Sequence, residues 1–325
     1  MSKAPLRLVF LDAATFGDIS LDRFMTNWDC TIHPLSASSE IPERLEGYQA
    51  AVINKVALDR SILDMPTARE LRLIVVAATG TDNVDLKVAR ARGIKVCNVP
   101  GYATHSVARF TISLILELTT HAGRYGQVVR AGAWQKSPMF TRFDFPSVEL
   151  YGKKLGIIGY GSIGRSVAEM ARGLGMVVLV SARPGSSGPT PESRLDLDVL
   201  LEQSDVVSLH CPLTPQTKNL IASRALALMK PSAFLINTAR GGLVDEPALI
   251  EALRERRLAG AALDVLTEEP PSIDHPIIRA TQELDNLLVT PHCAWSAYEA
   301  RQRLLDEVAE NILAFLQGQE RNRVV

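Results

Sequence analysis

Short apolar runs recur along the chain, and most of them are continuous instead of alternating with polar residues. Ten of these runs predict β-strands: residues 6–11, 50–54, 71–78 and 94–99, then 154–158, 177–181, 205–210, 233–238, 261–265 and 286–290. A strand that is covered on both faces shows no polar alternation, so the runs predict parallel strands buried between helices. With helical stretches between them, the pattern predicts doubly wound α/β sheets.

Two longer segments have helical periodicity and do not belong to this alternation of strands and helices. One spans residues 104–122, and the other, 296–317, carries Leu304, Val308, Ile312 and Phe315 on one core-facing stripe. A chain of 325 residues is long for a single core, so two domains are expected. The two helices flank the second strand series. We therefore predict an inserted domain (residues 101–295) within a discontinuous outer domain (residues 1–100 and 296–325).

Composition restricts the class of protein. Apolar residues make up 46% of the chain and charged residues 22%, with a formal net charge of −1 and no long basic run. This predicts a soluble globular enzyme that binds neither nucleic acid nor an anionic membrane surface. The apolar run at residues 6–11 is too short for a signal peptide or a membrane span, so we expect a cytoplasmic protein. No metal site is expected, because no Cys-x-x-Cys pair occurs among the scattered Cys30, Cys97, Cys211 and Cys293.

A glycine-rich turn lies between the strand at 154–158 and the helical stretch after it. Its sequence is Gly159-Tyr160-Gly161-Ser162-Ile163-Gly164. Gly159 permits a tight turn, Gly161 lets the backbone approach a pyrophosphate, and Gly164 lets the helix pack on the strand. The amino terminus of the helix then presents free N–H groups to the phosphates. An ordinary strand-to-helix turn that merely favours glycine is the alternative, and the correct flanks favour a dinucleotide.

The end of the next strand bears on which dinucleotide is bound. A site that prefers NAD places Asp or Glu there, about 20 residues after the glycine turn. This chain instead has Ser181 and Arg183, with no acidic residue between 180 and 184. A guanidinium makes charge-assisted hydrogen bonds to phosphate, and Ser181 could add a hydroxyl donor. We therefore favour NADP, and NAD remains the alternative if Arg183 is only a solvated loop residue.

Three polar residues follow strand ends in the second half of the chain. Arg240 follows the strand at 233–238, Glu269 comes just after 261–265, and His292 follows 286–290. In an open parallel sheet the ligand crevice lies outside the carboxyl ends of the strands. We therefore expect the three side chains to face one crevice.

Seven motifs along the chain match one enzyme family. They are Gly80-Thr81-Asp82-Asn83-Val84-Asp85, the glycine turn, His210-Cys211-Pro212-Leu213-Thr214 through Thr217, Asn237-Thr238-Ala239-Arg240-Gly241-Gly242, Leu263-Asp264-Val265, Glu268-Glu269-Pro270 and Thr290-Pro291-His292. By these motifs the chain resembles the D-isomer-specific 2-hydroxyacid dehydrogenases over essentially its whole length. Segments 80–85 and 291–295 are most similar to the glycerate dehydrogenase and hydroxypyruvate (glyoxylate) reductase branch. The resemblance implies a Rossmann cofactor domain inserted into a flavodoxin-like substrate domain.

The resemblance assigns catalytic roles that suit 2-oxo acid chemistry. Arg240 resembles the arginine that binds the substrate carboxylate or carbonyl oxygen. His292 resembles the general acid that protonates the carbonyl oxygen during reduction, and Glu269 resembles its orienting partner. The backbone N–H groups of Thr79 and Gly80 match the clamp for the substrate carboxylate.

Two residues depart from the family pattern, whereas the oligomer and the remaining cofactor contacts are implied by the resemblance alone. Trp295, large where relatives have a small residue, is expected to form an apolar wall of the substrate pocket, with a packing role as the alternative. Arg109 stands where relatives often have Glu or Gln, and its role is open between substrate charge and an interface. A homodimer through the cofactor domain is expected, using the segment at 125–151. The remaining cofactor contacts are expected at Thr104, Cys211, Pro212, Thr217, Thr238, Ala239, Asp264 and His292.

These expectations lead to one function with two alternatives. The chain is expected to reduce a small 2-oxo acid, hydroxypyruvate or glyoxylate, to the D-2-hydroxy acid in a reversible, NAD(P)H-dependent reaction. One alternative is a D-2-hydroxyacid dehydrogenase for an apolar or aromatic 2-oxo acid. The other is a nicotinamide-sensing binding protein or corepressor without turnover, since fold alone does not certify activity.

Overall fold

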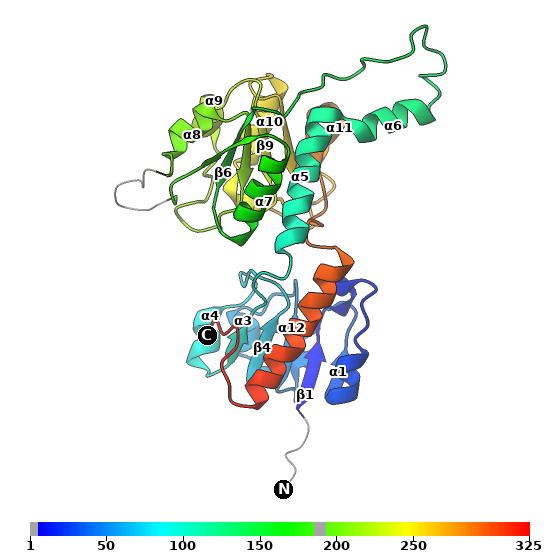
Figure 1. The fold of residues 1–325 in the computed structure, drawn as a ribbon. Helices are drawn as coiled ribbons and strands as arrows, with labels where there is room; N and C mark the ends of the chain where they lie inside the picture. The colour runs from blue at the N-terminus through cyan, green and yellow to red at the C-terminus, as the bar shows by residue number, and fades with distance from the viewer. Residues whose placement is uncertain (1–5, 185–192) are drawn as a thin grey trace. The chain divides into compact units, whose positions relative to one another are not determined.

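The computed structural model describes residues 6–184 and 193–325. The chain forms two compact units: unit 1 comprises Met1–Ala103 and Ser296–Val325, and unit 2 comprises Thr104–Trp295. Each unit contains one all-parallel sheet with helices on both faces (Figure 1). The predicted fold class, two doubly wound parallel-sheet domains, is confirmed.

Unit 1 has a five-stranded sheet in the order β2-β1-β3-β4-β5, which is the flavodoxin-like order. Four of its strands were predicted, whereas β2 was not. That strand lies at the edge of the sheet and is only partly buried, so its sequence, with Asp29 and Thr31, shows no apolar run. The strands are β1 (Arg7–Phe10), β2 (Asp29–Ile32), β3 (Ala50–Ile53), β4 (Leu73–Val76) and β5 (Lys95–Cys97).

Helices cover both faces of this sheet. On one face, α2, α3 and α4 pack against alternate strand residues, among them Val9, Ile53 and Val76. Helix α12 lies against β4 (Figure 1). Of its four predicted stripe residues, Leu304, Val308 and Ile312 are fully buried, whereas Phe315 is only partly buried. The helices are α1 (Asp22–Asn27), α2 (Ile41–Leu45), α3 (Arg60–Leu63), α4 (Leu86–Ala91) and α12 (Tyr298–Leu316), with short 3-10 helices at Ala13–Phe16 and Pro66–Ala68.

Unit 2 has a six-stranded sheet in the order β11-β10-β9-β8-β6-β7. Chain order reverses at β6, which has β7 on one side and β8 on the other. In such sheets ligands bind outside the carboxyl ends of the strands at this switch point. The strands are β6 (Lys154–Ile158), β7 (Val177–Val180), β8 (Val206–Leu209), β9 (Phe234–Asn237), β10 (Gly260–Leu263) and β11 (Leu287–Val289).

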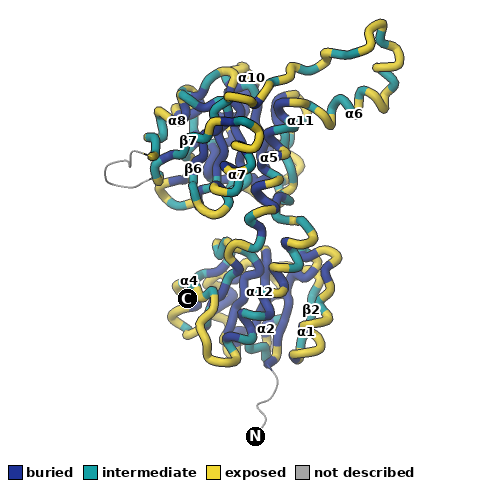
Figure 2. The backbone as a smooth tube through the Cα atoms, viewed as in Figure 1, coloured by how far each residue is buried: buried dark blue, intermediate teal, exposed yellow. Residues whose placement is uncertain are grey.

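Alternate strand residues of unit 2 enter two different cores. Leu155, Ile157 and Ile236 pack under α5 and α7, whereas Val207 and Leu235 pack under the helices of the opposite face. Burial on both faces explains why the inner strands β6, β8, β9 and β10 have continuous apolar sequences, and Figure 2 shows the centre of the sheet as buried. The helices are α5 (Thr104–Thr120), α6 (Ala122–Arg130), α7 (Ser162–Gly173), α8 (Leu197–Gln203), α9 (Ser223–Leu228), α10 (Glu246–Arg254) and α11 (Pro276–Glu283), with a 3-10 helix at Gly241–Leu243.

A buried carboxylate organises the carboxyl edge of the unit 1 sheet. Asp12 follows β1 and is 1% exposed, and it accepts hydrogen bonds from the backbone N–H groups of Asn54, Lys55 and Val56 after β3. The Asn83 amide in turn donates to the Val56 carbonyl at 2.8 Å. Asp12 therefore fixes the turn against which the 80–85 motif rests.

Replacing Asp12 by Ala should destabilise the protein by about 3 kcal/mol or more, because three N–H groups of a buried turn would lose their acceptor. Thermal unfolding followed by circular dichroism would measure the loss. As a control, Asp64→Ala removes an exposed carboxylate from the end of α3 and should change the unfolding free energy by less than about 0.5 kcal/mol. Equal Tm values for the two variants would contradict this account of Asp12.

Candidate active site

The glycine turn lies at the switch point of the unit 2 sheet. Gly159 follows β6 with φ of 98°, a conformation that residues with a side chain rarely adopt. A Cβ atom at this position would lie 2.4 Å from the backbone nitrogen of Cys211, which follows β8. Only glycine therefore lets the two strand ends approach each other this closely.

A pocket of about 640 Å³ opens beside this turn. Helix α7 begins after Gly161, which lines the pocket, and no capping side chain accepts a hydrogen bond from the N–H groups of its first turn. The glycine turn and this helix terminus fit the pyrophosphate of a dinucleotide. The described lining residues are Gly159, Tyr160, Gly161, Ser181, Ala182, Arg183, Pro184, Arg194, His210, Cys211, Pro212, Thr214, Gln216 and Thr217.

Eight of the residues that we expect to bind the cofactor lie in the lining of this pocket, and the others lie elsewhere in unit 2. Ser162, Ile163 and Gly164 form the first turn of α7, Thr104 begins α5, and Thr238, Ala239, Asp264 and His292 follow β9, β10 and β11.

Several hydroxyl groups at the expected positions are used inside the protein. Thr217 donates to the Pro212 carbonyl at 2.7 Å, and the Thr238 hydroxyl is 2.9 Å from that of Thr111 on α5. Ser181 is 1% exposed and donates to the Ala182 carbonyl at 2.7 Å. Ser181 and Thr217 therefore shape the wall of the pocket through their own turns, whereas Thr238 does not line it.

Arg194 is the pocket residue of most chemical interest that the sequence reading missed. Leu195 forms an isolated parallel bridge with Ser181, which places Arg194 beside the end of β7. The segment that contains Leu195 pairs with β7 through this single bridge, so it needs no run of apolar residues that the sequence could show. The one available signal was Arg194 itself, 11 residues after Arg183 and just before the apolar residues that lead into α8.

The loop after β9 holds Arg240. Asn237, the last residue of β9, is fully buried, and its amide accepts from the Ala239 N–H and donates to the Arg240 carbonyl. The Arg240 guanidinium donates to the Ala239 carbonyl at 2.8 Å. One buried side chain thus fixes the turn that presents the arginine.

The loop after β10 packs directly against this turn. A Cβ atom at Gly241 would lie 1.9 Å from the Leu266 carbonyl carbon, so the two backbones touch. Glu246 on α10 accepts from both the N–H and the hydroxyl of Thr267, at 2.8 and 3.0 Å. Its carboxylate also lies 3.5 Å from Nε2 of the buried His275. Sequence reasoning missed Glu246 and His275, because neither belongs to a motif with a chemical role.

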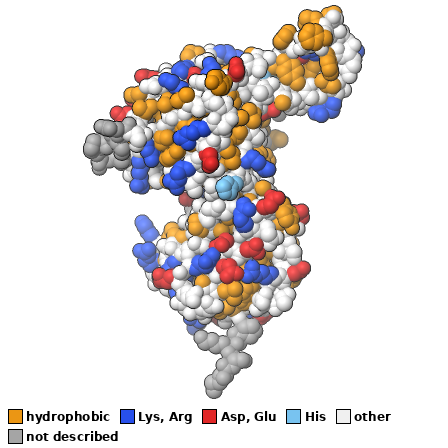
Figure 3. All heavy atoms as spheres, in the orientation of Figure 1, with side chains coloured by type: hydrophobic (Ala, Val, Ile, Leu, Met, Phe, Trp, Pro, Cys, Tyr) orange, Lys and Arg blue, Asp and Glu red, His pale blue; other side chains and the backbone are white. Residues whose placement is uncertain are grey.

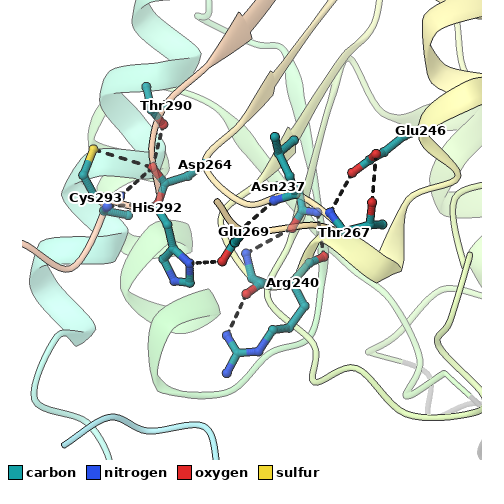
Figure 4. Close-up of polar contacts among 12 residues, drawn as sticks. Asn237, Arg240, Glu246, Asp264, Thr267, Glu269, Thr290, His292 and Cys293 are labelled. Carbon is teal, nitrogen blue, oxygen red and sulfur yellow. Dashed lines mark hydrogen bonds and ion pairs between the residues drawn. The ribbon is translucent and has the colours of Figure 1, made fainter. Parts of the chain in front are cut away.

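The same loop brings Glu269 to His292. Glu269 Oε1 accepts from the Leu266 N–H at 2.9 Å, and Oε2 lies 2.6 Å from Nδ1 of His292 (Figure 4). Their side chains are 34% and 26% exposed, so the pair is open to solvent on one side. The imidazole is therefore fixed through Nδ1, which leaves Nε2 for another partner.

Asp264 anchors the segment that carries His292. Its buried carboxylate accepts from the Thr290 hydroxyl at 2.6 Å and from the N–H groups of Cys293 and Ala294. The His292 N–H donates to the Asp264 carbonyl at 2.8 Å. His292 itself has φ of 50°, which costs a non-glycine residue on the order of 1 kcal/mol or more. These bonds hold the strained histidine in place, and Figure 4 shows them with Arg240 and Glu269 nearby.

The remaining predicted residues lie on both units. Thr79 and Gly80 follow β4 in unit 1, where Asn98 donates to the Thr79 carbonyl at 2.7 Å. Within the described chain, the N–H groups of Thr79 and Gly80 make no hydrogen bond. Trp295 is half-buried in unit 2 and precedes α12 instead of belonging to it, and Arg109 is exposed on α5.

The described residues contain neither a cluster of candidate metal ligands nor a membrane-spanning helix. No group of three or more His, Cys, Asp or Glu side chains could hold a metal ion in these parts of the chain. No helix in the same residues is long and apolar enough to cross a membrane.

Comparison with known proteins decides the family. Residues 112–294 match the model of the NAD binding domain of D-isomer specific 2-hydroxyacid dehydrogenases. The chain belongs to this family. It is 43% identical to the glycerate dehydrogenase of Methylorubrum extorquens over 324 residues, covering 98% of each chain. It is also 36% identical to the hydroxypyruvate reductase of Blautia hydrogenotrophica over 328 residues, covering 98% of this chain and 99% of the relative.

Solved structures agree with the sequence relatives. The TT0316 protein of Thermus thermophilus superposes with a TM-score of 0.86 at 35% identity, covering 98% of this chain and 100% of the other. The protein is therefore a D-2-hydroxyacid dehydrogenase that uses a nicotinamide cofactor and reduces 2-oxo acids. The predicted family, enzyme class and cofactor class are confirmed.

Replacing Glu246 by Gln should lower kcat about tenfold, because the loop that carries Glu269 would lose an acceptor for Thr267 and the His292 imidazole would be less well aligned. KM for the nicotinamide cofactor should not change, since Glu246 does not line the cofactor pocket. Steady-state kinetics with a 2-oxo acid would test this.

Glu251→Gln provides the matched control, because Glu251 is exposed on the same helix. A normal kcat in Glu246→Gln, or an equal loss in Glu251→Gln, would refute the positioning role of Glu246. Tm values of both variants would separate misalignment from unfolding.

Proposed function

We propose that the protein reduces hydroxypyruvate or glyoxylate to D-glycerate or glycolate, reversibly, and prefers NADPH to NADH. The observation that carries the catalytic part is the 2.6 Å contact between His292 Nδ1 and Glu269 Oε2. It supports a proton donor of fixed orientation at the carboxyl edge of a dinucleotide-binding sheet. The relatives named glycerate dehydrogenase and hydroxypyruvate reductase support the substrate class.

When bound, the reduced nicotinamide supplies the hydride for the carbonyl carbon. Arg240 binds the carboxylate or the carbonyl oxygen of the 2-oxo acid, and its planar guanidinium suits either group. His292 then gives the proton on Nε2 to the oxygen as negative charge develops on it. In the oxidative direction the same nitrogen takes the proton back. Glu269 keeps Nδ1 occupied, so that Nε2 is the nitrogen that exchanges the proton.

Three further residues are assigned to the substrate, Thr79 and Gly80 by the same resemblance and Trp295 by its size and its place three residues after His292. The N–H groups of Thr79 and Gly80 bind its carboxylate, which their lack of acceptors within the described chain supports. Trp295 forms an apolar wall that limits the size of the substrate. Small 2-oxo acids are therefore favoured over aromatic ones.

The NADPH preference is supported by the pocket lining at the end of β7. Arg183 lines the pocket there, and none of the described lining residues is acidic. A carboxylate at this position would bind ribose hydroxyls and repel a 2′-phosphate, whereas a guanidinium attracts it.

Absorbance at 340 nm would follow NADPH and NADH oxidation with hydroxypyruvate, glyoxylate, pyruvate and phenylpyruvate. We expect the highest kcat/KM for hydroxypyruvate or glyoxylate with NADPH. A preference for phenylpyruvate would instead favour a dehydrogenase of aromatic 2-oxo acids. Binding of NADPH without turnover of any acid would favour the nicotinamide-sensing alternative.

His292→Ala should lower kcat by about 10² or more in this assay, because the alkoxide would lose its proton donor. Glu269→Gln should also lower kcat, and the double variant should lose little more than His292→Ala alone, because the two residues act as a unit. Additive losses would indicate that Glu269 acts independently of His292. Near-normal activity of His292→Ala would refute its role as the general acid.

We also propose that the protein is a homodimer formed through unit 2. Helix α6 and the segment after it extend away from the sheet of that unit (Figure 1). Figure 3 shows hydrophobic side chains gathered on this projection, where Phe140 and Phe143 are 90% and 82% exposed. Exposed apolar groups in one segment are typical of a protein interface.

Replacing both Phe140 and Phe143 by Ser should convert the dimer to a monomer of 35.4 kDa, because the interface would lose its apolar anchors. Size-exclusion chromatography with light scattering would measure the mass. Ile273→Ser is the control, since Ile273 is 88% exposed on unit 2 outside the projection. A dimeric double variant would place the interface elsewhere, and a monomeric wild type would overturn the homodimer.

A further inference from the structure

The carboxyl end of β7 carries two guanidinium groups. Arg183 and Arg194 both line the pocket that begins at the glycine turn. They are 11 residues apart in the sequence, and the parallel bridge between Ser181 and Leu195 brings their segments together. Only Arg183 has a position that the dinucleotide motif anticipates.

Backbone pairing fixes where Arg194 lies. Ala182 donates to the Leu195 carbonyl at 2.7 Å, and the Leu195 N–H donates to the Val180 carbonyl at 2.9 Å. Nη1 of Arg194 donates to the Ser181 carbonyl at 3.1 Å. These contacts hold the guanidinium at the strand end, where the ribose of an adenosine would be bound.

An aromatic ring also supports Arg194. Its guanidinium carbon lies 5.2 Å from the centroid of the Tyr160 ring, within the range of a cation–π contact. Tyr160 belongs to the glycine turn, so the arginine is tied to both the turn and the strand. A guanidinium has five N–H donors, and the contact with Ser181 engages Nη1.

The Ser181 hydroxyl is a poor second ligand for a phosphate at this place. It donates to the Ala182 carbonyl, and the residue is 1% exposed. Burial lowers the pKa of His210 to about 4 and raises the pKa of the Cys211 thiol to about 11. Both groups are therefore neutral at pH 7, which leaves the arginines as the charged groups among the described lining residues.

We propose that Arg194 is a specificity-determining residue that binds the 2′-phosphate of NADP together with Arg183. This inference rests on the proposed preference for NADPH and deepens it, because it assigns the preference to a pair of cations from two segments. The contact with Tyr160 and the bond to Ser181 orient the guanidinium before the phosphate arrives, which lowers the entropic cost of binding.

Calorimetric titration of the full-length protein with 2′,5′-ADP and 5′-AMP tests the proposal without turnover. These two ligands differ only in the 2′-phosphate. The wild type should bind 2′,5′-ADP more tightly. Arg194→Gln should weaken 2′,5′-ADP binding by about tenfold to a hundredfold, the worth of a charge-assisted hydrogen bond, and change 5′-AMP affinity by less than about twofold.

Two further variants sharpen the test. Arg172→Gln removes an exposed arginine from the last turn of α7, outside the pocket, and should leave both affinities unchanged. Arg194→Lys keeps the charge but loses the planar donor geometry, so it should retain part of the discrimination. In kinetic assays Arg194→Gln should raise KM for NADPH and leave kcat at saturating NADPH unchanged.

Each outcome bears on a different statement. If the wild type binds the two ligands equally, the NADPH preference fails and the role of Arg194 fails with it. If the wild type discriminates and Arg194→Gln still does so to the same extent, the NADPH preference stands and the proposal for Arg194 is overturned. Equal weakening of both ligands by Arg194→Gln would also overturn it, since that result indicates a structural role.

Discussion

Every strand of the unit 2 sheet runs in the same direction, and the candidate site depends on that constraint. Parallel strands bring all their carboxyl ends to one edge, so the turns after β6, β8, β9, β10 and β11 become neighbours. Residues as far apart in sequence as Gly159 and His292 thereby belong to one edge. Burial of both sheet faces under helices leaves this edge as the place where polar groups can meet solvent and ligand.

The irregular loops at these edges are held by buried carboxylates. Asp264 binds the segment that carries His292, Glu246 binds the loop that carries Glu269, and Asp12 binds the turn after β3 in unit 1. A loop lacks the hydrogen bonds of a helix or strand, and a buried acceptor supplies them. The strain at His292 is tolerated for the same reason, since its neighbours fix the backbone on both sides.

Features that depend on a local sequence pattern could be predicted from the sequence. Features that arise only from tertiary contacts could not. Most of the ten predicted strands were readable because burial on both faces makes them continuously apolar. The edge strand β7 is partly exposed yet has the apolar sequence Val177–Val180, whereas the edge strand β2 carries Asp29 and Thr31. Arg240, Glu269 and His292 could be selected because each follows a strand end within a motif. Glu246 and Arg194 could not, because Glu246 acts through Thr267 on another loop and Arg194 reaches the pocket through one β-bridge.

Arg240, Glu269 and His292 could be predicted and Arg194 could not, because the two ends of the site must bind different groups. The loops after β9, β10 and β11 carry residues suited to a 2-oxo acid, and mutual backbone contacts such as Gly241 against Leu266 leave them little freedom to vary. In the proposed NADP site, the adenosine end needs positive charge for the 2′-phosphate, and two arginines on separate segments supply it. A change of charge after β7 can therefore alter the choice of cofactor without touching the loops that hold Arg240, Glu269 and His292.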